Sequence, residues 1–420
     1  MADFIEFLYS RFLLSDGVSI DTRTIEKDNL FFAISGPNFN ANTFAEEALE
    51  KGASYAVIDD EQYLTDDRMI LAEDALKALQ ALALFHRKRF KPPVIGITGS
   101  NGKTTTKELI VRVLSEKYIV HATKGNYNNH IGVPLTLLHI HPQVEIAVIE
   151  MGANHVGEIA GYCEVALPTH GLITNIGRAH TETFGGIEGV IRGKSELFDF
   201  LKKNDGQVFI NNSDAVLSNM AKRFEHPVLY PQRDVKLKKA SPYLEVSIGS
   251  LSEQTSIVGR YNYANIAAAV AIGRFFDVSD EKIMNAIVGY EPDNSRSQII
   301  KKGSVTIVLD AYNANPDSMR AALQSLAEND GDTLAILGDM NELEDSDEGH
   351  KEILDYAKEV GVSKVMTIGK KIGTVADPQF HFDTKELLEE ALKKMNLSNT
   401  TVLLKASRSI KLETILDSIS

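Results

Sequence analysis

The stretch GITGSNGKTTTKELI, residues 96–110, constrains the fold more than any other part of this chain. An apolar run from Val94 to Ile97 has the pattern of a buried strand, and it leads into a loop that contains Gly99 and Gly102. The apolar residues that follow recur at helical spacing. A strand, a glycine-rich turn and a helix in this order predict a phosphate cradle in an α/β fold, because glycines let backbone N–H groups approach an anion at the start of the helix.

The loop predicts a nucleotide site of a variant kind. The strict G-x-x-x-x-G-K-[ST] spacing needs glycine at the position of Ile97, so the pattern here is G-x-x-G-K-T. Lys103 is expected to reach the terminal phosphates, and Thr104 or Thr105 to offer a hydroxyl to Mg²⁺. No N-K-x-D tetrad follows, which points to ATP; the alternative is a plain glycine turn with an exposed lysine. The candidate nucleotide-binding residues of this loop are Gly99, Ser100, Asn101, Gly102, Lys103, Thr104 and Thr105.

Composition sets the broad class of the protein. With 420 residues, 43% of them apolar and 24% charged, we expect a globular protein of two to four domains. The formal net charge of −14 argues against a general nucleic-acid or membrane-surface binder. The single cysteine, Cys163, excludes an internal disulfide, and we interpret it as a buried hydrophobe rather than a catalytic thiol. No stretch has the pattern of a signal peptide or a membrane span, so we expect a cytoplasmic protein. We also expect a monomer.

Two turn-rich stretches divide the chain. RFKPP, residues 89–93, has the prolines of a linker, and YEPDNSRSQIIKKG, residues 290–303, is polar and loop-like. We therefore expect three domains, at residues 1–92, 93–300 and 301–420. Strand and helix patterns alternate, which predicts parallel sheets covered by helices, with sites at the carboxyl ends of strands. The expected strands are 29–34, 55–58, 94–98, 145–150, 171–176, 304–309, 333–338, 364–369 and 401–405, with more strand signals in 205–260; helical patterns include 43–51, 73–90, 318–328, 348–360, 385–396 and 409–417.

Three polar side chains lie where such a sheet would bring them to the phosphate loop. Glu150 ends the apolar strand of EIAVIEMGANHVGEI. A carboxylate at this point is well placed to bind Mg²⁺, and the alternative is an ordinary surface glutamate at the end of a strand. His180 follows another strand, in HGLITNIGRAHTETFGG, and is either structural or a ligand or catalytic group. Lys194 lies on the apolar face of a predicted helix, where the pattern alone favours a snorkelling side chain over a buried amine of lowered pKa. A neutral amine would react with CO₂ to give a carbamate, an oxygen ligand for Mg²⁺.

Further candidates for nucleotide contacts lie downstream. Asn262 and Asn265 open a helix in GRYNYANIAAAVAIG, where their amides suit an adenine edge or helix capping. Arg296, in SRSQ, suits phosphates or is an exposed linker residue. Asp310 ends the strand of VTIVLDAYNANPDSMRAAL and suits a ribose hydroxyl. Pro316 and Ser318 have plain helix-capping roles. Lys405, Ser407 and Arg408 suit anion binding at a helix start or capping of that helix.

Together these stretches resemble the Mur ligase family of peptidoglycan synthesis along nearly the whole chain. TGSNGKTTTKE is shared across that family and with folylpolyglutamate synthases, and its loop is G-x-x-G-K-T. GNYNNHIGVPLTLL, DAYNANPDSMRAAL and LGDMNELEDSDEGH are closer to the branch that adds D-alanyl-D-alanine. The resemblance implies three domains: a UDP-sugar-binding domain, a central P-loop-type ATPase with a parallel-rich sheet, and a C-terminal Rossmann-like domain. Departures are Asn42, where the family often has histidine, and Ala406, where glycine is common.

The resemblance also implies an activity and roles for the residues. ATP would phosphorylate the carboxylate of UDP-N-acetylmuramoyl-tripeptide, and the amine of D-alanyl-D-alanine would attack the acyl phosphate. By similarity, Lys103 holds the phosphates, Thr104 and Glu150 bind one Mg²⁺, and Glu150, His180 and carbamylated Lys194 bind a second. Asn262 and Asn265 would face the adenine, Arg296 the phosphates and Asp310 the ribose. The implied substrate residues are Ser19, Thr22, Arg23, Asn40 and Asn42 around the UDP moiety, Asn126, Asn128 and Asn129 near the uridine nucleotide or the acceptor, and Asn313, Asn315 and Ser318.

Two other functions compete with this one. A different ATP-dependent amide ligase, such as a folylpolyglutamate synthase, would share the phosphate loop, but GNYNNHIG and YNANPDS argue against it. A non-catalytic nucleotide-binding regulator would be expected to have lost reactive residues, and Lys103, Glu150, His180 and Lys194 are all present.

Overall fold

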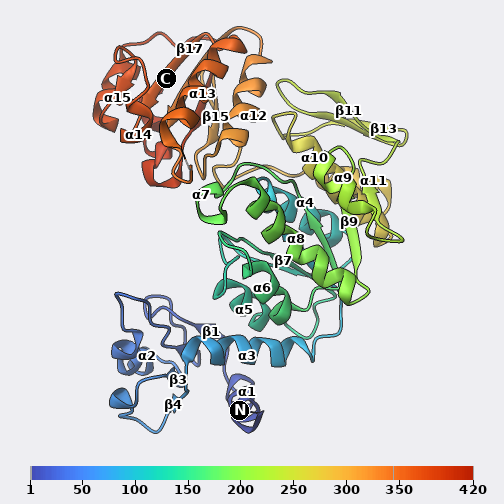
Figure 1. The fold of residues 1–420 in the computed structure, drawn as a ribbon, viewed down its shortest axis with the longest axis vertical. Coiled ribbons are helices and arrows are strands. Elements are labelled where there is room, and N and C mark those ends of the chain that lie inside the picture. Colours follow the sequence, from blue (N-terminus) through green and yellow to red (C-terminus); the bar gives the residue numbers. More distant parts are fainter. Residues whose placement is uncertain (1, 344, 420) are drawn as a thin grey trace.

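The computed structural model describes residues 2–343 and 345–419. Three parts follow one another along the longest axis (Figure 1): the first strands lie at one end, the last sheet at the other, and the sheet that carries the phosphate loop between them. The strands belong to four sheets, which occupy consecutive stretches of the chain. The expected α/β class with parallel-rich sheets is confirmed. The division near residues 92 and 300 stays a prediction.

The first sheet has four short parallel strands in the order β1-β2-β3-β4. Its strands are β1 (Val18–Ser19), β2 (Leu30–Phe32), β3 (Tyr55–Ile58) and β4 (Met69–Leu71). Around them lie α1 (Ala2–Phe12), α2 (Ala45–Glu50), α3 (Ala75–Arg87) and the 3₁₀ turns η1 (Ala41–Phe44) and η2 (Glu61–Tyr63). The helical pattern at 43–51 therefore divides into a 3₁₀ turn and an α-helix, because Asn40 caps the 3₁₀ turn through its side chain.

The central sheet is fully parallel, in the order β10-β9-β8-β5-β7-β6. Its strands are β5 (Val94–Thr98), β6 (Val120–Ala122), β7 (Ile146–Glu150), β8 (His170–Ile173), β9 (Gln207–Asn211) and β10 (Val228–Tyr230). The helices that cover it are α4 (Lys103–Ser115), α5 (Gly132–Leu138), α6 (Glu158–Ala166), α7 (Thr181–Phe184), α8 (Ile187–Lys203), α9 (Ala215–Ala221), α10 (Asn262–Phe275) and α11 (Asp280–Val288). Because β7 and β8 flank β5, the loops after these three strands meet at one edge of the sheet.

A small antiparallel sheet follows the central one. It consists of β11 (Val235–Lys239), β12 (Glu245–Ile248) and β13 (Leu251–Gln254). These strands, with β9 and β10, account for the strand signals expected in residues 205–260. We call residues 94–288 the central unit.

The last sheet has the order β14-β15-β19-β16-β17-β18, with β14 antiparallel and the rest parallel. Its strands are β14 (Gln298–Lys302), β15 (Val305–Asp310), β16 (Asp332–Gly338), β17 (Lys364–Ile368), β18 (His381–Phe382) and β19 (Thr400–Lys405). Its helices are α12 (Pro316–Ala327), α13 (Ser346–Glu359), α14 (Lys370–Gly373) and α15 (Lys385–Lys393). The pattern at 409–417 forms two 3₁₀ segments, η3 (Arg408–Ile410) and η4 (Leu412–Ser418), because Lys411 between them has a φ of +55°. We call residues 298–419 the C-terminal unit.

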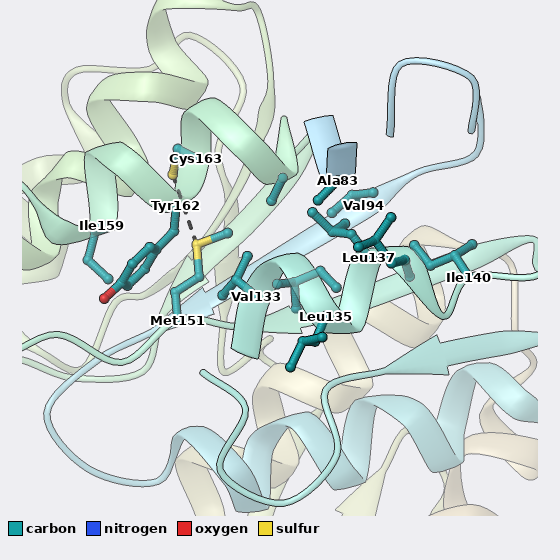
Figure 2. Packing of buried hydrophobic residues seen from close by; sticks show 14 of the residues in the cluster. Ala83, Val94, Val133, Leu135, Leu137, Ile140, Met151, Ile159, Tyr162 and Cys163 are labelled. Atoms are coloured by element: carbon teal, nitrogen blue, oxygen red, sulfur yellow. Dashed lines mark hydrogen bonds between the residues drawn. The ribbon is translucent and has the colours of Figure 1, made fainter. Parts of the chain in front are cut away.

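Helix α3 joins the first sheet to the central unit through a shared core. Figure 2 shows Ala83 of α3 beside Val94 and the α5 residue Leu137, all of them buried. Cys163 lies in the same cluster, with its Sγ 4.0 Å from Met151 Sδ, and burial raises the pKa of its thiol. The interpretation of Cys163 as a buried hydrophobe is confirmed. Within the described residues, no helix has the length and apolar character needed to span a bilayer.

Candidate functional site

A cavity of about 790 Å³ lies where the carboxyl ends of the central strands face the C-terminal unit. It collects residues that are far apart in the sequence, as expected for loops at one edge of a parallel sheet. Most of the predicted site residues line it: Ser100, Asn101, Gly102, Lys103, Thr104, Thr105, Asn126, Asn128, Asn129, Glu150, His180, Asn262, Asn265, Arg296, Asp310, Asn313 and Ser318.

The phosphate loop has the geometry that its sequence predicts. Gly102 is the N-cap of α4, with a left-handed φ of +77°. Lys103 folds back over the loop, and its Nζ donates to the carbonyls of Gly99 (2.8 Å) and Ser100 (3.3 Å). Desolvation by burial lowers the pKa of Lys103, while Glu150 acts in the opposite direction. The alternative of an exposed lysine on a plain turn therefore does not describe this loop.

Replacing Gly102 with alanine is expected to weaken ATP binding. A Cβ there would lie 2.8 Å from Asn265 Oδ1, and the left-handed backbone adds roughly 1–2 kcal/mol of strain. The dissociation constant for ATP, measured by calorimetry, should rise by about tenfold or more. Gly303→Ala is the matched control, because Gly303 also has a positive φ (+58°), yet no described atom lies within 4 Å of its Cβ position. Equal ATP affinity in both variants would contradict this account.

Glu150 ends β7 beside the phosphate loop and is buried. Its Oε1 accepts hydrogen bonds from Asn128 Nδ2 (2.8 Å) and Thr104 Oγ1 (3.3 Å). Its Oε2 has no hydrogen-bond partner among the described residues, and Lys107 Nζ lies 3.9 Å away. A buried carboxylate oxygen without a donor is a fitting ligand for a cation, so this corner of the cavity suits Mg²⁺. In residues 2–343 and 345–419, no group of three or more His, Cys, Asp or Glu side chains is arranged to hold a metal ion, so hydroxyl, carbamate or phosphate oxygens would complete the ligand set.

His180 lies in the loop that joins β8 to α7, with a left-handed φ of +56°. Its Nδ1 is 2.8 Å from Oε2 of Glu342, a residue of the C-terminal unit. The two groups are close without a hydrogen bond between them among the described residues, so the contact does not fix the tautomer of His180. His180 itself lines the cavity, where an imidazole nitrogen can serve as a metal ligand. Glu342 lies within a stretch that carried the family resemblance, but it was not predicted as a site residue.

Lys194 of α8 is only 1% exposed, so its side chain does not snorkel, and the alternative that the pattern alone favoured was wrong. Its Nζ donates to the carbonyl of Ala153 at 3.0 Å, and Ala153 lines the cavity although Lys194 itself does not. Burial, and then the charge of Lys103, lowers the pKa of Lys194 to about 7. A substantial fraction of this amine is therefore neutral near pH 7, which is the form that reacts with CO₂.

The predicted nucleotide residues meet at the side of the cavity near α10. Asn265 donates to Asn262 Oδ1 (2.8 Å) and accepts from Thr106 Oγ1 (3.0 Å). Neither asparagine caps the helix, because the N-cap is Tyr261, for which the described part of the chain shows no side-chain cap bond. Arg296 stacks on the ring of Tyr312, 3.8 Å from its centroid.

Two predicted residues of the C-terminal unit are already engaged with protein groups. Asp310 Oδ2 accepts from Lys405 Nζ at 2.5 Å, and the same amine contacts the carbonyl of Asn313. Asn315 does not line the cavity; it forms a capping box with Ser318 and an amide pair with Asn101 of the phosphate loop, Nδ2 to Oδ1 at 2.8 Å. The capping role expected of Ser318 is confirmed.

The first sheet contributes none of its predicted residues to the cavity. Asn42 is buried and donates to Asp59 Oδ1 (2.8 Å), while Asn40 caps η1. Arg23 pairs with Asp21 through two of its nitrogens. Contacts of the UDP moiety with Ser19, Thr22, Arg23, Asn40 and Asn42 stay a prediction.

Several residues that line the cavity were not predicted. Asp317 lies in the first turn of α12, where an acidic residue is common, and Glu342 lies in the loop between β16 and α13. Except for Tyr162, the others also stand in motifs that resemble the family, but their residue types alone do not mark them as site residues, because only the packing of separate elements brings them together. They include His130, Asn154, Glu158, Tyr162, Asn175, Gly177, Tyr261, Ser297 and Tyr312.

Comparisons with known proteins agree with this geometry. Residues 97–273 match the Mur ligase middle domain, and residues 295–408 match the Mur ligase glutamate ligase domain. The chain is 36% identical to the UDP-N-acetylmuramoyl-tripeptide–D-alanyl-D-alanine ligase of Bacillus subtilis, over 95% of this chain and 92% of the relative. It is 32% identical to the ligase of the same name from Escherichia coli, with the same coverage.

A solved structure shows the same arrangement. The MurF ligase of Thermotoga maritima, in complex with ADP, superposes with a TM-score of 0.86 at 27% identity, covering 97% of each chain. The likeness includes all parts of the chain, and two family domains match the units that form the cavity. The chain belongs to the Mur ligase family.

Proposed function

We propose that this protein is an ATP-dependent ligase that joins D-alanyl-D-alanine to UDP-N-acetylmuramoyl-tripeptide and so forms the pentapeptide precursor of peptidoglycan. The observation that carries the proposal is the shared cavity, in which the phosphate loop, Glu150 and His180 face Asp310 and Glu342 of the C-terminal unit. The near full-length likeness to ligases of this name supports the choice of substrates.

The phosphate loop binds ATP in this proposal. Lys103 exchanges its contacts with loop carbonyls for the terminal phosphates, to which the start of α4 also points. Asn262 and Asn265 face the adenine, Arg296 a phosphate and Asp310 the ribose. The ADP bound in the Thermotoga relative is consistent with a nucleotide here.

Thr104 and Glu150 would hold one Mg²⁺, and Glu150, His180 and carbamylated Lys194 a second. When bound, the cations neutralise charge on the transferring phosphoryl group. Glu150 brings Oε2, which has no hydrogen-bond partner within the described chain, and Lys194 brings an amine that is largely uncharged above pH 7. Carbamate formation joins the amine nitrogen to the carbon of CO₂ and releases one proton.

The chemistry is a phosphoryl transfer followed by an acyl transfer. The tripeptide carboxylate takes the γ-phosphoryl group of ATP, with ADP as the leaving group. The amine of D-alanyl-D-alanine then forms the new C–N bond while phosphate leaves and the nitrogen loses a proton. No protein nucleophile is needed, because the residues only orient groups and stabilise charge. Residues of the C-terminal unit line the cavity, and in this proposal that unit limits the access of water, which would otherwise hydrolyse the acyl phosphate. We place the reaction in the cytoplasm and expect a monomer.

The test is release of phosphate from ATP with UDP-N-acetylmuramoyl-tripeptide, with and without D-alanyl-D-alanine, followed by the mass of the product. Both tripeptide forms, with meso-diaminopimelate or lysine, are supplied. Release that depends on D-alanyl-D-alanine, with a pentapeptide product, is expected. Absence of release with either form would overturn the assigned substrates, and turnover with folate and glutamate would identify the competing ligase. ATP binding without consumption would favour a regulator.

A further inference from the structure

The loop between β8 and α7, residues 174–180, lies between the phosphate loop and the C-terminal unit; we call it the bridging loop. Its bonds to the phosphate loop are dense. Ser100 Oγ donates to the Gly177 carbonyl (3.0 Å) and accepts from the Gly177 N–H (2.9 Å). The Asn101 N–H donates to Asn175 Oδ1 (3.0 Å), and the Asn101 carbonyl accepts from Thr174 Oγ1 (2.6 Å) and Asn175 Nδ2 (2.9 Å). A displacement of one loop therefore displaces the other.

The other side of the bridging loop is tied to the C-terminal unit through Arg178. Its backbone N–H and its Nε donate to the carboxylate of Asp317, at 2.7 and 3.0 Å, in the first turn of α12. Its two terminal nitrogens form a parallel pair of bonds to Glu352 of α13, at 2.8 and 3.0 Å. Glu352 also accepts from Arg320 (2.6 Å). One guanidinium thus joins two helices of the C-terminal unit to the loop that supports the phosphate loop.

Gly177 makes this contact possible. A Cβ on Gly177 would lie 2.5 Å from Asp317 Oδ2. The carboxylate therefore reaches the Arg178 N–H only because residue 177 has no side chain. The backbone N–H and the guanidinium of Arg178 both donate to the carboxylate of Asp317, so this contact differs from an isolated ion pair between two long surface side chains.

Resting on the function proposed above, we propose that Arg178 is a positioning residue: with Asp317 and Glu352 it forms a latch that couples docking of the C-terminal unit to the geometry of the phosphate loop. His180, two residues further on, meets Glu342 of the same unit, so the latch and the candidate metal ligand move with one loop. Side chains of the latch are between 31% and 40% exposed, so water screens their charges only partly. The parallel pair of bonds needs the planar fork of arginine, which lysine lacks.

The test compares Arg178→Lys and Glu352→Gln with the wild-type enzyme. Lysine keeps the charge but cannot form the fork, and glutamine keeps the shape of Glu352, which does not line the cavity. We expect kcat to fall by about 5- to 20-fold in each variant, with a smaller change in the KM for ATP. The double variant should lose little more than either single one, because both break the same contact.

Small-angle scattering gives a second readout, which does not require turnover. With a non-hydrolysable ATP analogue, both variants should show a larger radius of gyration than the wild-type protein, at an unchanged melting temperature. Arg260→Ala is the control, because Arg260 also pairs across the units, with Glu328, but through one 3.4 Å contact and with no hydrogen bond to the bridging loop among the described residues. Variants that match this control in kcat and in radius of gyration would overturn the latch. If the wild-type protein fails to ligate, the proposed function falls, while the scattering result still decides the latch.

Discussion

Replacing Lys194 with alanine is expected to remove nearly all ligase activity, by at least about 100-fold in kcat, while ATP still binds. The amine is buried, its Nζ touches the carbonyl of a cavity residue, Ala153, and its pKa is lowered to about 7. A lysine that forms a carbamate for Mg²⁺ cannot be replaced by a side chain without nitrogen. Phosphate release and ATP calorimetry separate the loss of chemistry from the loss of nucleotide binding.

Lys202→Ala, at the exposed end of the same helix, is the matched control and should keep wild-type turnover. The carbamate itself is checked by the ¹³C resonance that appears after incubation with labelled bicarbonate, which should be absent in Lys194→Ala. A Lys194→Ala enzyme that keeps most of its turnover would contradict the role proposed for this residue.

The lowered pKa also predicts how stability depends on pH. In the folded protein the pKa of Lys194 falls from 10.5 to about 7, so between these values the unfolded chain binds the proton more tightly. The contribution of this group is most favourable above pH 10.5 and is lost as the pH falls towards 7. Lys194→Met removes that dependence, so it should exceed the wild type in stability most clearly below pH 7. Guanidinium unfolding at pH 6 and pH 9 measures the difference in free energy of unfolding between Lys194→Met and the wild type at each pH. A difference that is no smaller at pH 9 than at pH 6 would refute this prediction.

Replacing Glu150 with glutamine is expected to be the second most damaging change. Glu150 Oε2 is buried, has no donor among the described residues, and lies at the end of β7 beside Thr104. An amide has no charge to offer Mg²⁺ at this point. Mutation of a residue that only supports a metal ligand typically lowers metal affinity by about 10- to 100-fold. Loss of the ligand itself should therefore raise the Mg²⁺ concentration for half-maximal rate by at least about tenfold.

The control for this variant is Glu145→Gln, the same change at the exposed residue directly before β7, where Glu145 Oε2 accepts from the Ile119 N–H at 2.8 Å. It should leave the Mg²⁺ requirement unchanged. Binding of Mn²⁺ in place of Mg²⁺, followed by electron paramagnetic resonance, reports on the site without turnover. An unchanged Mg²⁺ requirement in Glu150→Gln would exclude this carboxylate as a ligand.

Much of the fold follows from local pattern. The strands at 55–58 and 94–98 form at the expected residues, since buried parallel strands are short apolar runs between turns. The phosphate loop was also predictable, because its chemistry depends on neighbours in the chain. The segment at 409–417 was less so, because the left-handed Lys411 that divides it has no signal in the sequence.

The sequence by itself determined the residue types: a glycine-rich loop with Lys103, a strand-end Glu150, and a lysine on an apolar helical face. These are properties of short segments, in which the separation of two residues along the chain fixes how far apart they lie in the structure. Only the tertiary structure decided that Lys194 is buried rather than snorkelling, that Glu342 meets His180, and that Arg178 joins two units. Burial and pairing across units depend on how separate elements pack. Such contacts join residues of different segments, so the local pattern of one segment does not determine their free energy.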